Sequence, residues 1–277
     1  MTLLIQISDP HFGTERLPVV DALVRLVHEQ APNLVVLSGD ITQRARRGQF
    51  RAARAFVDRL GVAMLAIPGN HDIPLFNVAA RLFNPYTNYC RAFGAELEPV
   101  FESDQLLVIA LNTTRFYRHT DGEVSAEQIE CVAQRLERAA ATQLRIVVTH
   151  QPVAVTRAQD EINLLHGRVE AVRRWALAGA DLILGGHIHL PFMLALHEQF
   201  AGLPRKVWAI QAGTAVSSRV RHEAGNSVNL IRYTGLRLHR RDAVVERWDY
   251  LESQQCFRPV DINNLHIDAS TGMTKHV

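Results

Sequence analysis

Five short apolar segments of the sequence are each followed by side chains that can bind a metal ion. The apolar segments are rich in Leu, Ile and Val, which is typical of buried strands. The side chains that follow them are Asp9, His11, Asp40, Asn70, His150, His187 and His189. In open α/β sheets a ligand binds beyond the carboxyl ends of the strands, where residues distant in sequence can meet. We therefore expect these side chains to form one catalytic site.

The spacing of these residues indicates a site for two divalent metal ions. A single residue separates Asp9 from His11, and His187 from His189, so each pair can face the same way at a strand exit. If one carboxylate bridges, each ion receives four protein ligands and keeps positions for water and substrate. The ligands offer imidazole and oxygen but no thiolate, which is compatible with manganese, iron or zinc.

The charge of such a site indicates its substrate. Two divalent cations, two aspartates and a bridging hydroxide leave about one positive charge, which attracts an anion. A phosphoryl group suits this arrangement, because one metal can hold the nucleophile while both stabilise the oxygens of an in-line displacement. The sequence therefore favours an enzyme that acts on phosphate esters.

Five short motifs follow one another along the sequence: Asp9-Pro-His11, Gly39-Asp40, Gly69-Asn70-His71-Asp72, His150 and Gly186-His187-Ile188-His189. In this order they resemble the motifs of the calcineurin-like metallophosphoesterases. The resemblance implies a four-layer α/β/β/α sandwich. It implies one metal held by Asp9, His11, Asp40 and His189, and a second held by Asp40, Asn70, His150 and His187. Many relatives have a second histidine where this chain has Gln151.

His71 is interpreted as the general acid. Asn70 is the ligand in this motif, so the next side chain is expected to point toward the leaving oxygen, where a protonated imidazole could donate a proton. The alternative is a buried histidine held by a carboxylate such as Asp72, with no proton transfer. Asp72 is either an orienting catalytic residue or an acceptor that shapes the loop.

Three further segments are candidates for substrate contact. The aromatic segment 73–94 could form a lid, although its spacing favours helix faces packed on the body. Arg115 lies in the 113–122 loop, and Arg219 and Arg221 lie in the 213–222 loop, where guanidinium groups could reach a phosphate. The arginine run over 44–54 is interpreted as a solvated helix face, so we do not expect nucleic acid as a partner.

The elements that position these residues are expected to build an α/β fold. Helical patterns cover 17–30, 49–60, 126–141 and 169–178, and Ser125 to Gln128 forms a capping box. Strands and helices alternate to about residue 185, which predicts a mainly parallel sheet. Later strands, over 191–197, 206–211, 227–233, 236–240 and 244–250, predict an antiparallel sheet facing it. Residues 1–250 are expected to form a single domain, and residues 251–277 a flexible or partner-contacting tail.

Composition fits one large domain of a cytoplasmic protein. The chain has 277 residues, 47% hydrophobic residues and a net charge of +2, so nothing demands a nucleic acid or a membrane. Its three cysteines follow no disulfide or zinc pattern, which favours a reducing compartment. No segment approaches the roughly 20 apolar residues of a membrane span. A homodimer is compatible with the sequence.

The leading hypothesis is a dinuclear metal phosphodiesterase. A metal-bound hydroxide would attack phosphorus and His71 would protonate the leaving group. The resemblance is greatest to the small bacterial class that includes cyclic-nucleotide phosphodiesterases, which implies a small-molecule phosphodiester substrate. Alternatives are a nuclease, a nucleotide-sugar pyrophosphatase, or a non-catalytic interaction scaffold that has lost its ligands. No ligand is missing here, which argues against the scaffold.

Overall fold

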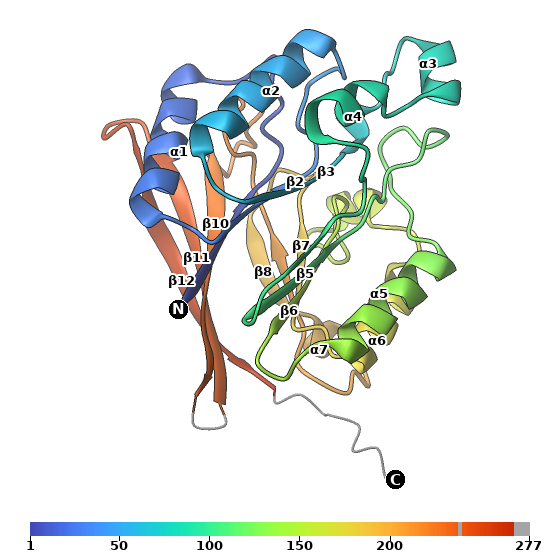
Figure 1. Ribbon diagram of the computed structural model, residues 1–277, viewed down its shortest axis with the longest axis vertical. Coiled ribbons are helices and arrows are strands. Elements are labelled where there is room, and N and C mark those ends of the chain that lie inside the picture. Colours follow the sequence, from blue (N-terminus) through green and yellow to red (C-terminus); the bar gives the residue numbers. More distant parts are fainter. Residues whose placement is uncertain (238–239, 269–277) are drawn as a thin grey trace.

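A computed structural model describes residues 1–237 and 240–268, and these form two six-stranded sheets (Figure 1). The first sheet has, from edge to edge, β12 (Cys256–Ile267), β11 (Arg240–Leu251), β10 (Ser227–Arg237), β1 (Thr2–Ile7), β2 (Leu34–Ser38) and β3 (Met64–Ile67). The second has β4 (Val100–Glu102), β5 (Leu106–Ala110), β6 (Leu144–Val148), β7 (Leu182–Gly185), β9 (Trp208–Gln211) and β8 (Phe192–Ala195).

Helices cover the outer face of each sheet (Figure 1). On the first sheet lie α1 (Leu17–Gln30), α2 (Arg47–Leu60) and α4 (Thr87–Phe93). On the second lie α5 (Ala126–Arg138) and α6 (Arg168–Ala178). Shorter elements are α3 (Val78–Phe83), α7 (Leu196–Gln199) and two 3-10 turns, η1 (Asn70–Asp72) and η2 (Ala158–Asn163). The predicted four-layer α/β/β/α sandwich is confirmed.

Three apolar layers hold the sandwich together, and strand alternation creates them. Along β1, Leu3 and Ile5 pack against the helices, whereas Leu4 between them faces the second sheet. In β5, Val108 packs toward the first sheet and Ile109 toward the α5 and α6 side. Each fully buried aliphatic side chain of this kind contributes about 1.5–3 kcal/mol relative to exposure. Both sheets are therefore fixed in place on both faces.

The predicted helices are close to those observed. Helix α1 has the expected bounds, and α2, α5 and α6 differ from expectation by at most three residues at an end. At the start of α5, Ser125 Oγ accepts from the Gln128 amide at 3.1 Å, and Gln128 Oε1 accepts from the Ser125 amide at 2.9 Å. The predicted capping box is confirmed.

The prediction of a separate antiparallel sheet in the last third is wrong. Strand β9 pairs in parallel with β7, and β8 pairs with β9, so both extend the second sheet. Strands β10, β11 and β12 instead extend the first sheet beside β1. The segments 227–233 and 236–240 were expected as two strands, but 227–237 is one strand with an irregularity between Tyr233 and Leu236. Periodicity indicates strands but not the sheet that each strand joins.

The expected boundary at residue 250 also needs correction. Strand β12 pairs antiparallel with β11 from Leu251↔Cys256 to Arg241↔Ile267, so this part of the expected tail belongs to the first sheet. Only Phe257, Leu265 and Ile267 in it are buried, which is why no alternating pattern was visible. Residues 269–277 lie outside the described part of the chain. Among the described residues, the structure contains no helix with the length and apolar character needed to span a bilayer.

Candidate metal centre

The seven predicted ligands lie at the carboxyl ends of five strands. Each follows its strand within about four residues, after β1, β2, β3, β6 or β7. The ligand atoms of Asp9, His11, Asp40 and His189 lie within 4.8 Å of one another, and those of Asp40, His150 and His187 form a second such group. Asn70 Oδ1 lies 3.3 Å from His150 Nε2, which adds Asn70 to the second group. The structure thus brings together all seven residues, in the two sets implied by the resemblance.

Backbone geometry at the strand ends turns the ligands inward. A positive φ, between 42° and 73°, occurs at Asp9, His11, Asp40, His187 and His189. Non-glycine residues rarely adopt this left-handed region, which costs on the order of 1–3 kcal/mol when the surroundings enforce it. Here the loops enforce it on one another. The Asp9 amide donates to the Gly39 carbonyl at 3.1 Å, and the His11 amide donates to the Asp40 carbonyl at 3.1 Å.

Two motif glycines allow the loops to approach closely. A Cβ atom at Gly69 would lie 2.1 Å from the Asp40 amide nitrogen and 2.2 Å from Asp40 Oδ1. A Cβ atom at Gly186 would lie 2.0 Å from Ser8 Oγ and 2.6 Å from Asp9 Oδ2. No real Cβ atom occupies such positions, so both sites require glycine. Each aspartate is therefore placed against the glycine of another strand's loop.

The charges of the buried ligands depend on one another. Burial opposes the charge of Asp9, but its hydrogen bond and charge interaction with His189 lower its pKa to about 2. Burial lowers the pKa of His11 to about 3 and that of His187 to about 4, so both are neutral and can offer a lone pair. Burial also opposes the charge of His150, but Asp40 raises its pKa to about 9. A cation bound there would displace the His150 proton.

The ring nitrogens that face the site are placed to bind cations. His187 Nδ1 is buried and has no hydrogen-bond partner among the described residues. His11 Nε2 and His189 Nε2 lie only 2.9 Å apart, so their lone pairs converge on one point. The outer nitrogens are engaged: His150 Nδ1 lies 2.9 Å from the Ser38 carbonyl, and His189 Nδ1 lies 2.6 Å from the Arg219 carbonyl. These bonds fix the rings so that Nε2 faces the site.

Asp72 holds two ligand loops together. Its carboxylate is buried and accepts from the amides of Ile41 at 2.9 Å, Thr42 at 2.8 Å and Gly69 at 2.9 Å. Burial, and then the charge of Asp40, raise the pKa of Asp72 to about 6. The bonds join the loop after β2 to the loop after β3. This geometry favours the loop-shaping interpretation of Asp72.

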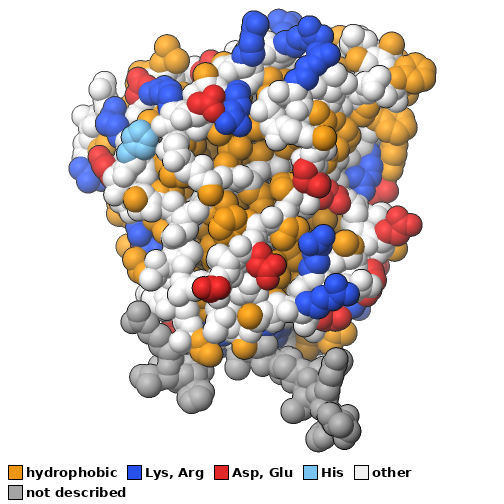
Figure 2. All heavy atoms as spheres, in the orientation of Figure 1, with side chains coloured by type: hydrophobic (Ala, Val, Ile, Leu, Met, Phe, Trp, Pro, Cys, Tyr) orange, Lys and Arg blue, Asp and Glu red, His pale blue; other side chains and the backbone are white. Residues whose placement is uncertain are grey.

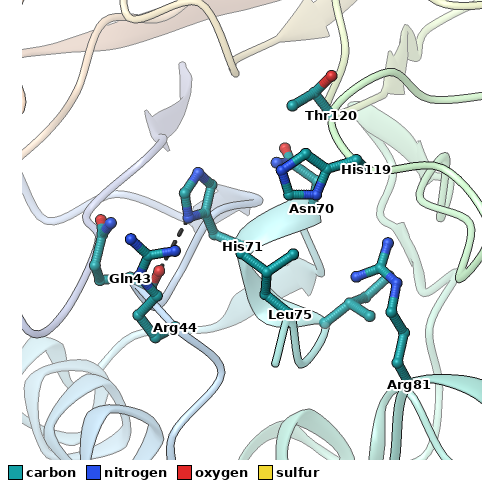
Figure 3. A pocket seen from close by; sticks show the side chains of 9 residues that line it. Gln43, Arg44, Asn70, His71, Leu75, Arg81, His119 and Thr120 are labelled. Atoms are coloured by element: carbon teal, nitrogen blue, oxygen red, sulfur yellow. Dashed lines mark hydrogen bonds between the residues drawn. The ribbon is translucent and has the colours of Figure 1, made fainter. Parts of the chain in front are cut away.

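His71 is oriented by a backbone carbonyl. Its Nδ1 lies 2.9 Å from the Gln43 carbonyl, to which it must donate (Figure 3). Its Nε2 lies 3.2 Å from Nη1 of Arg219, which also lies 3.1 Å from Gln43 Oε1. The Arg219 guanidinium therefore lies beside His71, and its contact with a substrate stays a prediction. His71 Nε2 is the ring atom that faces this guanidinium.

The other two candidate arginines are engaged elsewhere. Arg221 Nη1 bonds to the Asp160 carboxylate at 2.9 and 3.1 Å and to the Ile188 carbonyl at 3.2 Å. Arg115 bonds to the carbonyl of Asn112 at 2.9 Å and to Gln128 Oε1 at 2.6 Å. Protein acceptors thus contact both guanidinium groups, and substrate contact by Arg115 and Arg221 stays a prediction.

The aromatic segment 73–94 divides between core and surface. Tyr89 is buried and its hydroxyl donates to the Ala66 carbonyl at 2.8 Å, and Phe93 packs against the same core. Phe76 and Phe83 are exposed. The core interpretation therefore holds for α4 but not for the segment before it.

Some residues near the site carried no signal in the sequence. Asn163, in η2, places Oδ1 3.2 Å from His187 Nε2, although no motif marks it. Gln151, directly after His150, is buried, accepts from Thr113 Oγ1 and donates to the Thr120 carbonyl at 3.2 Å. Gln151 therefore fastens both ends of the 113–122 loop.

Comparison with known proteins places this chain in a family. The family model for calcineurin-like phosphoesterases matches residues 2–191, which contain every ligand described above. The chain belongs to the calcineurin-like phosphoesterase family. It is a metal-dependent phosphoester hydrolase, as the motifs predicted.

Individual relatives agree with this assignment. The phosphoesterase is 29% identical over 206 residues to a probable cyclic nucleotide phosphodiesterase of Synechococcus sp., covering 70% of this chain and 76% of that one. Its fold matches a dimetal phosphatase from Danio rerio with a TM-score of 0.65 and 15% identity, covering 96% and 99% of the two chains. It also matches purple acid phosphatase PPD1 of yellow lupin with a TM-score of 0.69 and 11% identity, covering 96% and 53%. These two structures show the fold alone.

Proposed function

We propose that this phosphoesterase hydrolyses small phosphodiesters, cyclic nucleotides or related compounds, with two divalent cations of manganese, iron or zinc. The observation that carries the proposal is the pair of ligand groups that share Asp40. The relative named as a probable cyclic nucleotide phosphodiesterase supports the choice of a diester. Cations held there would act as Lewis acids on the phosphoryl oxygens and would lower the pKa of the attacking water.

His71 is assigned as the general acid that donates a proton to the leaving oxygen. Its Nδ1 donates to the Gln43 carbonyl, so Nε2 is the atom that can accept a proton and pass it on. Nε2 lies beside the ligand groups, because the His71 and His11 rings are only 4.9 Å apart. The hydrogen bond to this carbonyl orients the ring.

Arg219 is assigned to a phosphoryl oxygen. Its Nη1 lies 3.2 Å from His71 Nε2, so it is already within reach of the reacting centre. An anionic phosphoryl group would attract the guanidinium and leave His71 Nε2 free to carry its proton. One residue would thus bind the substrate and expose the acid.

The alternative functions are less favoured by the geometry. A nuclease needs a basic surface leading to the site, whereas the arginines at 47, 51 and 54 form an exposed face of α2 at one end of the molecule, which is typical of a solvated helix (Figure 2). One of them, Arg54, forms an ion pair with Asp58. A non-catalytic scaffold would not need seven ligands converging in two groups.

The proposal is tested by turnover with added manganese. We would compare bis-(p-nitrophenyl) phosphate, p-nitrophenyl phosphate and a panel of cyclic nucleotides at equal metal saturation. We expect kcat/KM to be higher for diesters than for the monoester, because contacts to the second ester group help to position phosphorus. A clear preference for the monoester would contradict the phosphodiesterase assignment.

A further inference from the structure

A cavity of about 70 Å³ lies beside Asn70 and His71 (Figure 3). We call it the leaving-group pocket. Besides Asn70 and His71 it is lined by Gln43, Arg44, Ile73, Leu75, Arg81, His119 and Thr120. Asn70 belongs to the second ligand group, and His71 is the assigned acid. The organic group on the leaving oxygen must lie next to the acid that protonates that oxygen, and this cavity is next to that acid.

The pocket has two walls from distant parts of the sequence. Ile73 and Leu75 follow the ligand loop after β3, whereas His119 and Thr120 come from the 113–122 loop after β5. Gln151 ties Thr120 to the loop after β6, on the side of the second sheet. The width of the pocket therefore depends on whatever joins the 113–122 loop to the 73–75 segment.

Arg81, on α3, makes that connection through three backbone carbonyls. Its Nε donates to Phe116 at 2.7 Å and its Nη2 donates to Arg118, both in the 113–122 loop. Its Nη1 donates to Pro74 at 3.3 Å, in the opposite wall. A planar guanidinium suits this task because its donors diverge in fixed directions. Figure 3 shows Arg81 beside the pocket, with His119 and Thr120 on the adjoining loop.

The lining indicates what the pocket would accept. Ile73 and Leu75 offer apolar contact, whereas Arg44 and His119 offer polar groups. The Arg44 guanidinium lies over the Phe76 ring at 5.5 Å, which limits its movement. Such a lining suits a compact leaving group that has an apolar face and acceptor oxygens, as a sugar or a nitrophenolate has.

We propose that this pocket holds the leaving group of the phosphodiester and that Arg81 is the positioning residue that fixes its width. The inference rests on the proposed function, because it assigns one side of the same substrate. Arg81 touches neither metal ligands nor reacting atoms in this role. It acts through the two walls that its guanidinium joins.

The test compares Arg81→Gln with Arg91→Gln. The control removes the same charge from the last turn of the neighbouring short helix α4. The substrates are methyl p-nitrophenyl phosphate and bis-(p-nitrophenyl) phosphate, which release the same leaving group but retain different ester groups. We expect Arg81→Gln to lower kcat/KM about 10- to 100-fold for both substrates to the same extent, because misplacement by about 1 Å has costs of this order. Arg91→Gln should match the wild type.

Two results would overturn the inference. A loss of kcat/KM confined to the bis ester would mean that the pocket holds the retained ester group. Equal kcat/KM values for Arg81→Gln and Arg91→Gln would mean that Arg81 does not position the leaving group. Amide hydrogen exchange gives a readout that does not depend on turnover: residues 113–122 should exchange faster in Arg81→Gln and not in Arg91→Gln. If the wild type hydrolyses neither diester, the proposed function fails and the leaving-group assignment fails with it, while the exchange result still decides whether Arg81 joins the walls.

Discussion

The metal centre and the leaving-group pocket lie side by side but are held in different ways. Most ligands of the metal centre are buried, leave strands of two packed sheets and are fixed by backbone geometry, including positive φ at five of the seven ligands. The pocket walls belong to loops and to α3, which has no buried residue. They are joined by side-chain bonds such as those of Arg81. In the proposed function, chemistry thus depends on the strand ends and selectivity on the loops.

This contrast fits the demands on each region. Cations need donors placed to within a few tenths of an ångström, which strand ends in a packed sandwich provide. A substrate pocket needs shape, which can vary when a loop changes without disturbing the sheets. Substitutions in the two regions should therefore have different effects. In the first region metal and turnover should both be lost, whereas in the second kcat/KM should fall while both metals are retained.

The largest expected effect is that of Asp40→Asn. Asp40 belongs to both ligand groups, so its loss leaves two cations facing each other with weaker screening. We expect loss of metal from both groups and no measurable turnover. Asp9→Asn, which affects one group, is the matched comparison and should be less damaging. Metal content is measured beside rate, and retention of two metals in the Asp40 variant would refute the bridge.

His71→Ala should lose about 10²- to 10⁴-fold in kcat, as is typical when a general acid is removed. The seven other motif residues already complete the ligand groups, so metal content should stay at the wild-type level. The loss should shrink on a substrate with a good leaving group, which needs less protonation. A lost metal ion in this variant would instead make His71 a ligand.

Arg219→Gln should mainly affect catalysis, whereas Arg221→Gln should mainly affect stability. Arg219 contacts His71 Nε2, so its loss should lower kcat/KM about 10-fold or more, and more for diesters than for the monoester. Arg221 bonds to the buried Asp160 carboxylate, so its loss should lower the free energy of unfolding by about 1–3 kcal/mol with a smaller change in kcat/KM. Kinetics and thermal unfolding of both variants check this, and equal kinetic effects would contradict the division.

The smallest expected effect is a slight stabilisation of the fold, and it comes from comparing two glycine substitutions. The Cβ atom of Gly69→Ala would collide with Asp40. This variant should therefore displace Asp40 and weaken metal binding. A Cβ at Gly48, in the first turn of α2, meets no atom within 4 Å outside its own helix, so Gly48→Ala should stabilise the fold by about 0.4–1 kcal/mol. Thermal unfolding with and without manganese distinguishes the two. A Gly69 variant with wild-type metal affinity would mean that the loop can relax.

The sequence predicted the residues that converge in the two groups, because each motif is local. A strand, a turn and a ligand such as Asp40 lie within a few residues, and parallel strands bring their carboxyl ends to one edge. The helices were also predictable, because α1 and α5 carry clear periodicity and, for α5, a cap. These signals need no knowledge of distant contacts.

The remaining features depend on distant contacts. The bonds of Arg81 to Phe116 and Arg118 cross more than 30 positions in the sequence and follow no period. The pairing of Arg221 with Asp160 is equally invisible, so Arg221 was expected to face a substrate. Strand β12 was missed because an exposed edge strand need not alternate. Its place in the first sheet follows from pairing with β11.

Anomalous X-ray diffraction at the manganese absorption edge tests the central claim most directly. Crystals of the protein saturated with manganese should show two anomalous peaks per chain. One should lie among Asp9, His11, Asp40 and His189, and the other among Asp40, Asn70, His150 and His187, with Asp40 contacting both. A single peak, or two peaks without Asp40 between them, would contradict the shared site on which the account rests.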